Sequence, residues 1–139
     1  MYDNLTDSNR SDFVAGYTEA LLWSTTISSE DGSCDSTAHS RCLEVDPESL
    51  ARIERCALAF LESNARALDL AYEGGRDWEH LGHDAHLTRE GHGTGFWDCY
   101  DIRPTLRDHL TARARADRTE AMVWVEDVDG EPVAFVEVS

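Results

Sequence analysis

Two stretches of the chain repeat apolar residues at the spacing of one face of an α-helix. In the first, apolar side chains recur every three or four residues after Ser11, which is a suitable N-cap. The second begins at Asp46-Pro47, a typical helix start, and keeps the same spacing as far as Gly74-Gly75. We therefore predict two long helices, over residues 11–24 and 47–73.

The residues between these helices, from about 25 to 46, are rich in Ser, Thr, Asp and Gly and have no apolar period. They predict a long polar loop. A third, shorter helix is predicted from Thr105, because Thr105 and Asp108 have the spacing of a capping box directly after Pro104. Its inward-facing residues would be Leu106, Leu110 and Ala114.

Two further segments have the pattern of β-hairpins. Near the C-terminus, apolar and polar residues alternate over residues 122–126 and 133–138, and Asp129-Gly130 between them favours a tight turn. Earlier in the chain, three closely spaced glycines separate residues 84–89 from residues 96–100. Glycine permits the positive φ values of such connections, so we predict a second hairpin here.

A turn centred on Gly91 would place Asp84 directly opposite Asp98. Two opposed carboxylates repel each other unless a metal ion, a shared proton or an arginine such as Arg89 lies between them. Without such a cation, the change Asp84→Asn is expected to be neutral or mildly stabilising.

Together these elements predict an α+β fold, with two long helices and one short helix packed on an antiparallel sheet made of the two hairpins. The order of elements does not repeat strand, helix and strand, so a parallel sheet is not expected. A chain of 139 residues has the length of one domain, and we predict a single domain over residues 1–139.

The charge of the chain changes the picture of its partners. The 28 acidic residues outnumber the 12 basic ones, all arginines, and give a net charge of -16. Nucleic-acid binding needs a cationic face, so direct binding to nucleic acid is not expected. An acidic surface suits a basic surface on another protein, and we predict a partner of that kind. The alternative is that the acidity serves solubility or salt adaptation.

The absence of an apolar run of about 18 residues predicts that no segment spans a membrane. The polar, acidic N-terminus lacks the features of a secretory signal, so we expect a cytoplasmic protein with reduced cysteines. Cys34, His39 and Cys42 are a weak zinc candidate, because no fourth ligand is close in sequence. Cys99 is a weaker nucleophile candidate, because no base stands at a recognisable position.

Histidines and carboxylates concentrate around the glycine-rich segment, where three interpretations remain open. The first is a Zn²⁺ or Mn²⁺ site that activates a water for hydrolysis, with the ligands His83, Asp84, His92 and Asp98. The second is an anion held by the backbone N–H groups of residues 91–95. The third, which we favour and which needs no cofactor, is structural: His83 and His92 hydrogen-bond backbone groups of a hairpin packed on aromatic residues such as Trp97.

Residues 82–98 read GHDAHLTREGHGTGFWD. This segment resembles a motif, GHDFWLTRNGHGAGFWDR, of a family of small proteins of tailed bacteriophages, and residues 13–24 and 56–60 are similar to the same family. The chain departs from the motif at Ala85, His86, Glu90 and Cys99. The resemblance implies a phage origin and no particular activity. It marks these candidate binding residues: His83, Asp84, Arg89, His92, Trp97 and Asp98.

Size, acidity and this resemblance predict a small phage accessory protein that binds a host protein with a basic surface. Such a protein would serve host takeover or anti-defence, including by nucleic-acid mimicry. The residues favour a protein that is not an enzyme. The alternative is a small metal-dependent hydrolase that uses His83, Asp84, His92 and Asp98, and a virion component is a third, less favoured hypothesis.

Overall fold

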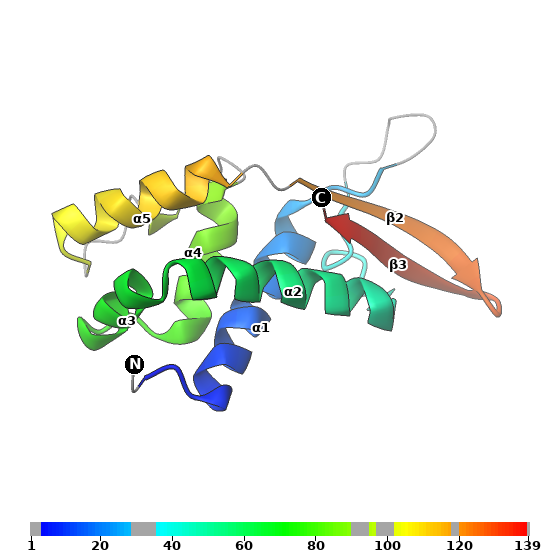
Figure 1. The fold of residues 1–139 in the computed structure, drawn as a ribbon. Helices are drawn as coiled ribbons and strands as arrows, with labels where there is room; N and C mark the ends of the chain where they lie inside the picture. The colour runs from blue at the N-terminus through cyan, green and yellow to red at the C-terminus, as the bar shows by residue number, and fades with distance from the viewer. Residues whose placement is uncertain (1–3, 29–35, 90–94, 97–101, 118–119, 139) are drawn as a thin grey trace.

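The helices of this protein form a body, and a β-hairpin projects from it (Figure 1). The computed structural model describes residues 4–28, 36–89, 95–96, 102–117 and 120–138. The predicted α+β class is confirmed, since these residues contain five helices and three strands. The elements are α1 (Asp7–Ser24), β1 (Glu44–Val45), α2 (Pro47–Ser63), α3 (Ala65–Glu73), α4 (Trp78–Arg89), α5 (Pro104–Ala116), β2 (Ala121–Val128) and β3 (Glu131–Val138).

Helices α1 and α4 pack closely because each has a glycine at their contact. A Cβ atom on Gly16 would lie 1.9 Å from the carbonyl oxygen of Glu79, and one on Gly82 would lie 2.0 Å from the carbonyl oxygen of Phe13. Both distances are far below van der Waals contact, so any side chain at either position would push the helices apart. The close packing brings Phe13 and Trp78 into an edge-to-face contact with ring centroids 6.4 Å apart.

Asn64 divides the predicted helix of residues 47–73 into α2 and α3. Its backbone, with φ -127° and ψ 25°, leaves the helical region. Its side-chain Nδ2 donates to the carbonyl oxygen of Phe60 at 2.9 Å, and its Oδ1 accepts from Arg113 Nε at 3.0 Å. An amide side chain that satisfies the backbone and a neighbouring helix in this way favours a break over a continuous helix.

Helix α2 begins as predicted, and its first turn also binds the sheet. The Asp46 side chain accepts from the Ser49 N–H at 3.0 Å, which is an N-cap hydrogen bond. The fully buried Ser49 hydroxyl accepts from the Val136 N–H of β3 at 2.9 Å and lies 3.2 Å from Asp46 Oδ2. One serine thus connects the start of α2 to the middle of β3.

The C-terminal hairpin is confirmed and is longer than predicted. Strands β2 and β3 pair in antiparallel fashion along their whole length. Asp129 and Gly130 connect them with φ values of 52° and 86°, as a two-residue turn with two positive φ angles requires. The predicted core alternation is also present, because Val123, Ala134 and Val136 are fully buried on one face.

The rest of the sheet differs from the prediction. Strand β1 pairs in parallel with β3, so the described sheet is mixed, with the strand order β1-β3-β2. Strand β1 and a bridge from Ile27 to Val123 lie inside the region predicted as a polar loop. These pairings involve one or two residues each, which is too short to produce a period in the sequence.

The predicted second hairpin is wrong, because residues 84–89 are the second half of helix α4. The buried positions Trp78, Leu81 and Ala85 recur at spacings of three and four, as in a helix, but polar residues between them obscure the period. Of the expected second strand, Phe96 is described and is buried, and residues 97–100 lie outside the described residues. The opposition of Asp84 and Asp98 therefore loses its basis.

Two helix starts also differ from the prediction. Helix α1 begins at Asp7 rather than at Ser11, with the Thr6 hydroxyl accepting from the Asn9 N–H at 3.1 Å. Helix α5 begins at Pro104, so the capping box at Thr105 is wrong. No described helix is both long enough and apolar enough to cross a membrane.

Candidate functional site

Helix α4 carries three of the six motif residues, His83, Asp84 and Arg89. The other three, His92, Trp97 and Asp98, lie outside the described residues. Because successive residues of a helix point about 100° apart, neighbouring motif residues face different partners.

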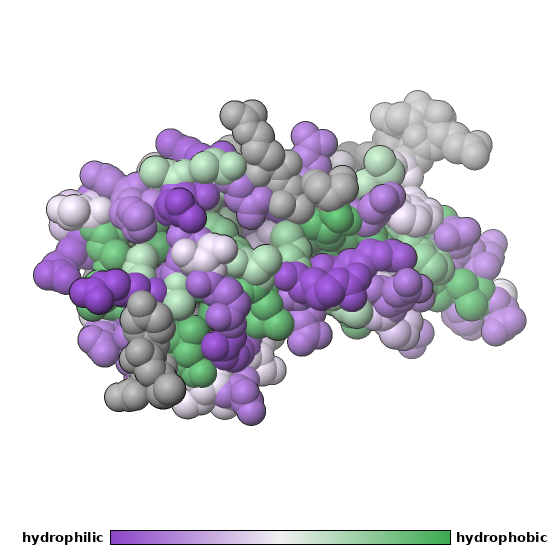
Figure 2. Space-filling view, in the orientation of Figure 1, coloured by the Kyte–Doolittle hydropathy of each residue, from purple (hydrophilic) through white to green (hydrophobic). Residues whose placement is uncertain are grey.

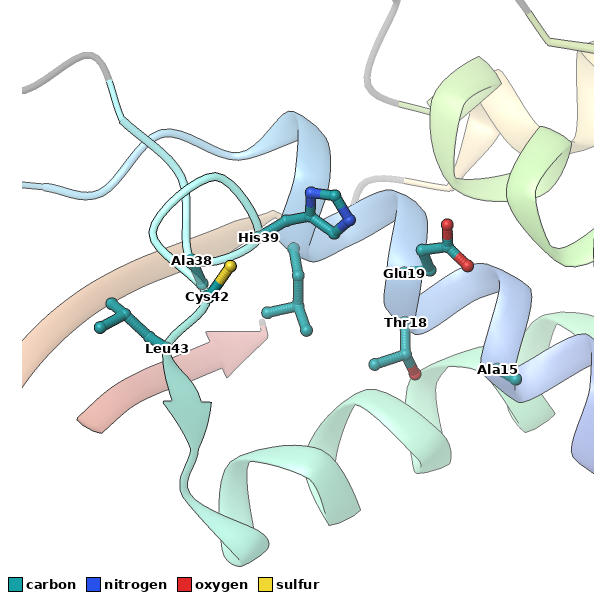
Figure 3. A pocket seen from close by; sticks show the side chains of 8 residues that line it. Ala15, Thr18, Glu19, Ala38, His39, Cys42 and Leu43 are labelled. Atoms are coloured by element: carbon teal, nitrogen blue, oxygen red, sulfur yellow. The ribbon is translucent and has the colours of Figure 1, made fainter. Parts of the chain in front are cut away.

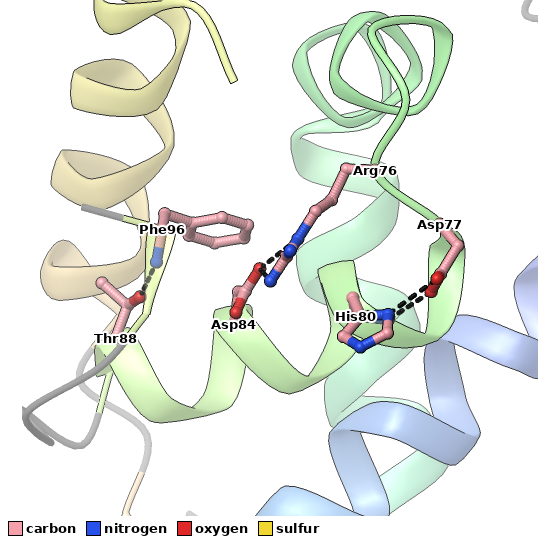
Figure 4. A network of polar contacts seen from close by, with 6 residues as sticks. All are labelled: Arg76, Asp77, His80, Asp84, Thr88 and Phe96. Atoms are coloured by element: carbon pink, nitrogen blue, oxygen red, sulfur yellow. Dashed lines mark hydrogen bonds and ion pairs between the residues drawn. The ribbon is translucent and has the colours of Figure 1, made fainter. Parts of the chain in front are cut away.

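Asp84 is buried, with 4% of its surface exposed, and its charge is paired with Arg76. Arg76 Nη2 and Nε donate to Asp84 Oδ2 at 2.9 Å and 3.1 Å (Figure 4). Arg76 lies just before α4, in the turn that follows α3. Arg76 is thus a cation paired with Asp84, where the sequence suggested a metal ion, a shared proton or an arginine such as Arg89.

The start of α4 is fixed by a second carboxylate, Asp77 (Figure 4). Its Oδ1 accepts from the His80 N–H at 2.8 Å, and its Oδ2 lies 2.7 Å from His80 Nδ1. Burial raises the pKa of Asp77, but the hydrogen bonds from His80 outweigh it, so the pKa is lowered overall. At the other end of the helix, the Thr88 hydroxyl accepts from the Phe96 N–H at 2.9 Å.

His83 is half-buried and points to a different neighbour from Asp84. Its Nε2 lies 3.8 Å from Glu19 Oε1 on α1. Among the residues that the structure describes, no three His, Cys, Asp or Glu side chains are grouped so that they could hold a metal ion. The proposed ligands His92 and Asp98 lie outside that set of residues.

Arg89 belongs to a partly buried polar cluster between α1, α2 and α4. Its Nη2 lies 3.2 Å from His86 Nδ1, its Nη1 lies 3.9 Å from Cys56 Sγ, and its guanidinium carbon lies 5.7 Å from the centroid of the Tyr17 ring. The Tyr17 hydroxyl and Cys56 Sγ are 3.4 Å apart. Burial raises the pKa of Tyr17 more than Arg89 lowers it, so this hydroxyl stays protonated.

Sequence reasoning missed two partners in these contacts, Arg76 and His86. His86 is fully buried, although it is one of the positions where the chain departs from the phage motif. Arg76 stands eight residues before Asp84, a separation that brings the two together only if residues 78–89 form a helix. Reading that segment as a strand therefore concealed both partners.

A cavity of about 600 Å³ lies between α1 and the turn of residues 38–43 (Figure 3). Its wall is mostly apolar, with Leu22 and Leu43 among the lining residues. His39 and Cys42, two members of the weak zinc candidate, also line it, and the third member, Cys34, lies outside the described residues. Cys42 is exposed and has a φ of 53°.

Residues 120–138, which include β2 and β3, form a strongly acidic segment that we call the acidic ribbon. It contains six carboxylate residues and no Arg, Lys or His. All six are exposed: Glu120, Glu126, Asp127, Asp129, Glu131 and Glu137. Figure 2 shows hydrophilic side chains around the projecting end of the hairpin, with a hydrophobic area among them.

The two faces of the acidic ribbon differ because residues alternate along a strand. One face carries Val123 and Val136 into the core. The other carries the cross-strand pair Trp124 and Phe135, whose rings stack with centroids 6.0 Å apart.

Comparisons of the chain with models of protein families, with curated proteins and with solved structures found no match.

Proposed function

We propose that this protein acts by binding a basic surface of another protein. The observation that carries the proposal is the acidic ribbon, where six exposed carboxylates project from the helical body without a cationic residue in the same segment. Carboxylates held close together repel one another, and a basic partner relieves that repulsion. An acidic surface of this kind also speeds encounter with a basic one through long-range attraction.

The partner that fits best is a host protein whose basic surface normally meets nucleic acid. Such surfaces neutralise the phosphates of a nucleic acid, and the exposed carboxylates of the acidic ribbon offer charge of the same sign. In this proposal the chain is a phage accessory protein of host takeover or anti-defence, acting by nucleic-acid mimicry in the host cytoplasm. The resemblance of residues 82–98 to the phage motif supports that setting.

The contacts of the motif residues favour binding over hydrolysis. Asp84 is hydrogen-bonded to Arg76, and Arg89 lies within the partly buried cluster of Tyr17 and Cys56. These side chains stabilise the packing of α4, which gives a structural reason for their place in the motif. The ribbon, in contrast, holds its six carboxylates at exposed positions, where a partner can reach them.

The test is capture of purified, nuclease-treated nucleic-acid-binding proteins from a bacterial host. The immobilised chain is exposed to the heparin-binding fraction of a lysate at about 50 mM and about 500 mM salt, since salt screens exposed charges. We expect retention at low salt, release at high salt and displacement by excess duplex DNA.

The control is a column of an unrelated acidic protein with a comparable net charge, which reports ion exchange alone. Proteins retained by this chain and not by the control are the specific partners, and they can be identified and purified for direct measurement. If the chain retains nothing beyond the control at either salt concentration, the proposed function is wrong.

A further inference from the structure

The outer face of the acidic ribbon combines aromatic rings with carboxylates on a single surface. Trp124 and Phe135 stand opposite each other at its centre. The alternation of strand residues places three exposed glutamates on the same face. Glu131 lies next to the turn of the hairpin, Glu137 lies near its open end, and Glu126 follows Trp124 two residues later on β2.

This face is open to a partner. Met122 and Val128, which lie on it, are 53% and 42% exposed, although both are apolar. The opposite face is covered, since Val123 and Val136 are fully buried. A two-stranded ribbon with one buried face and one apolar, aromatic and acidic face has the composition of a binding surface.

We infer that the outer face of the acidic ribbon binds an arginine-rich segment of the partner protein. This inference rests on the proposed function and names the surface and the chemistry that carry it out. A guanidinium group can stack on the rings of Trp124 and Phe135 while it donates to a neighbouring carboxylate. Trp124 Nε1 already donates to Glu126 Oε2 at 3.1 Å, which fixes one carboxylate next to the indole ring.

The same chemistry favours arginine over lysine. An ammonium group is attracted by the carboxylates equally well, but it is a compact, strongly hydrated charge that does not stack. General attraction by net charge would treat the two residues alike. Discrimination between them therefore separates recognition by this face from attraction by the whole acidic molecule.

The experiment compares two peptides of equal charge, nona-arginine and nona-lysine, by titration calorimetry at low salt. We expect the arginine peptide to bind about 2- to 5-fold more tightly, the range of an exposed cation–π contact. The indole N–H signal of Trp124 in an NMR spectrum of the full chain should shift on addition of the arginine peptide, because the peptide competes for Glu126.

Two matched sets of substitutions locate the binding. The ribbon set is Glu126→Gln, Glu131→Gln and Glu137→Gln, and the control set is Asp12→Asn, Glu54→Gln and Asp108→Asn, exposed carboxylates on α1, α2 and α5. Both sets change the net charge equally and leave buried packing untouched. We expect the ribbon set to weaken the arginine peptide about 10-fold or more, and the control set about 2-fold or less.

A second pair of variants tests the aromatic contact. Trp124→Leu should remove the preference for arginine, whereas Trp23→Leu, at a tryptophan of α1 that is 48% exposed, should keep it. If Trp124→Leu proves poorly folded by circular dichroism, the ribbon set still tests whether the arginine peptide binds to this face, since that set changes surface charge alone.

Equal weakening by both carboxylate sets, or equal affinity for the two peptides, would overturn this inference and leave the proposed function standing. The chain could also associate with itself, and the ribbon set could abolish that association. This result would assign the outer face to a second copy of the chain and would likewise overturn the inference. If neither peptide binds and no host protein is captured, the proposed function is overturned together with it.

Discussion

A buried aspartate is paired with an arginine in the turn before α4. Asp84 is 4% exposed, and Arg76 Nε and Nη2 both donate to its Oδ2. The change Arg76→Leu would remove these two charged hydrogen bonds from a buried carboxylate, and we expect it to lower the free energy of unfolding by about 2–3 kcal/mol, because Arg76 itself is partly exposed. Urea denaturation measures this loss, with Arg66→Leu at an exposed position as the control.

The change Asp84→Asn separates the two views of this residue. The predicted hairpin made it neutral or stabilising, whereas the pair with Arg76 makes it destabilising by about 1–2 kcal/mol. An Asp84→Asn protein that is more stable than the unmodified chain would show that Asp84 is repelled by another carboxylate.

The acid dependence of the fold has a contribution from Asp77. Its pKa in the folded chain lies below the ordinary value, because hydrogen bonds from His80 outweigh burial. The folded state therefore gains stability from the charged form at pH values above the unfolded pKa and loses it as the pH falls through the lower folded pKa. Asp77→Asn keeps the capping oxygen but does not titrate.

We therefore expect the unmodified chain to be more stable than Asp77→Asn at pH 7, with the difference closing as the pH falls below about 4, the ordinary aspartate value, and through the lower folded pKa. Thermal melting followed across this range measures the difference. A gap that stays constant through the acid range would contradict the role of the Asp77 charge.

Among the elements, the packing of α1 on α4 is the most sensitive to side-chain size. In an exposed helix, replacing glycine by alanine stabilises by roughly 0.5–1 kcal/mol. At Gly16 and Gly82 a new Cβ would lie about 2 Å from a carbonyl oxygen, so overpacking outweighs helix propensity. We expect Gly16→Ala and Gly82→Ala each to destabilise by about 3 kcal/mol or more.

Chemical denaturation of both variants tests this, with Ser11→Ala on the exposed side of α1 as the control. A Gly16→Ala protein with unchanged stability would show that the two helices can separate at low cost.

The elements that the sequence predicted well are those with strong local signals. Helix α2 has an aspartate cap and a proline at its start, and the C-terminal hairpin has the Asp129-Gly130 turn. Helix α4 was missed because its apolar period is interrupted by histidines and Asp84, whose partner Arg76 is outside the helix. The break at Asn64 depends on Arg113, 49 residues away, so local sequence could not reveal it.

The candidate site was less predictable than the fold for the same reason. The sequence grouped His83 with Asp84, but adjacent residues of a helix diverge, and the two contact Glu19 and Arg76 instead. The acidic ribbon was predictable as a hairpin and as a charged segment. Its aromatic outer face needed the register, which places Trp124 opposite Phe135.

At the scale of the whole molecule, all 12 arginines lie outside the acidic ribbon, and the rest of the chain mixes them with 22 of the 28 carboxylates. On the helical body, α5 carries the exposed Arg113 and Arg115, whereas the ribbon has no arginine. The ribbon is thus the segment where negative charge is not offset by arginines of the same segment, which favours contact with a basic surface there. The projecting position of the hairpin in Figure 1 allows that contact without obstruction from the helices.

The position of β3 after all five described helices also determines the order in which a newly made molecule can fold. Ser49 and Val136 are hydrogen-bonded across 87 residues, and β1 pairs with the same late strand. Helix α2 forms through local contacts, but its partner strand leaves the ribosome many residues after it. The sheet-facing side of α2 in the nascent chain therefore stays uncovered until β3 has been translated.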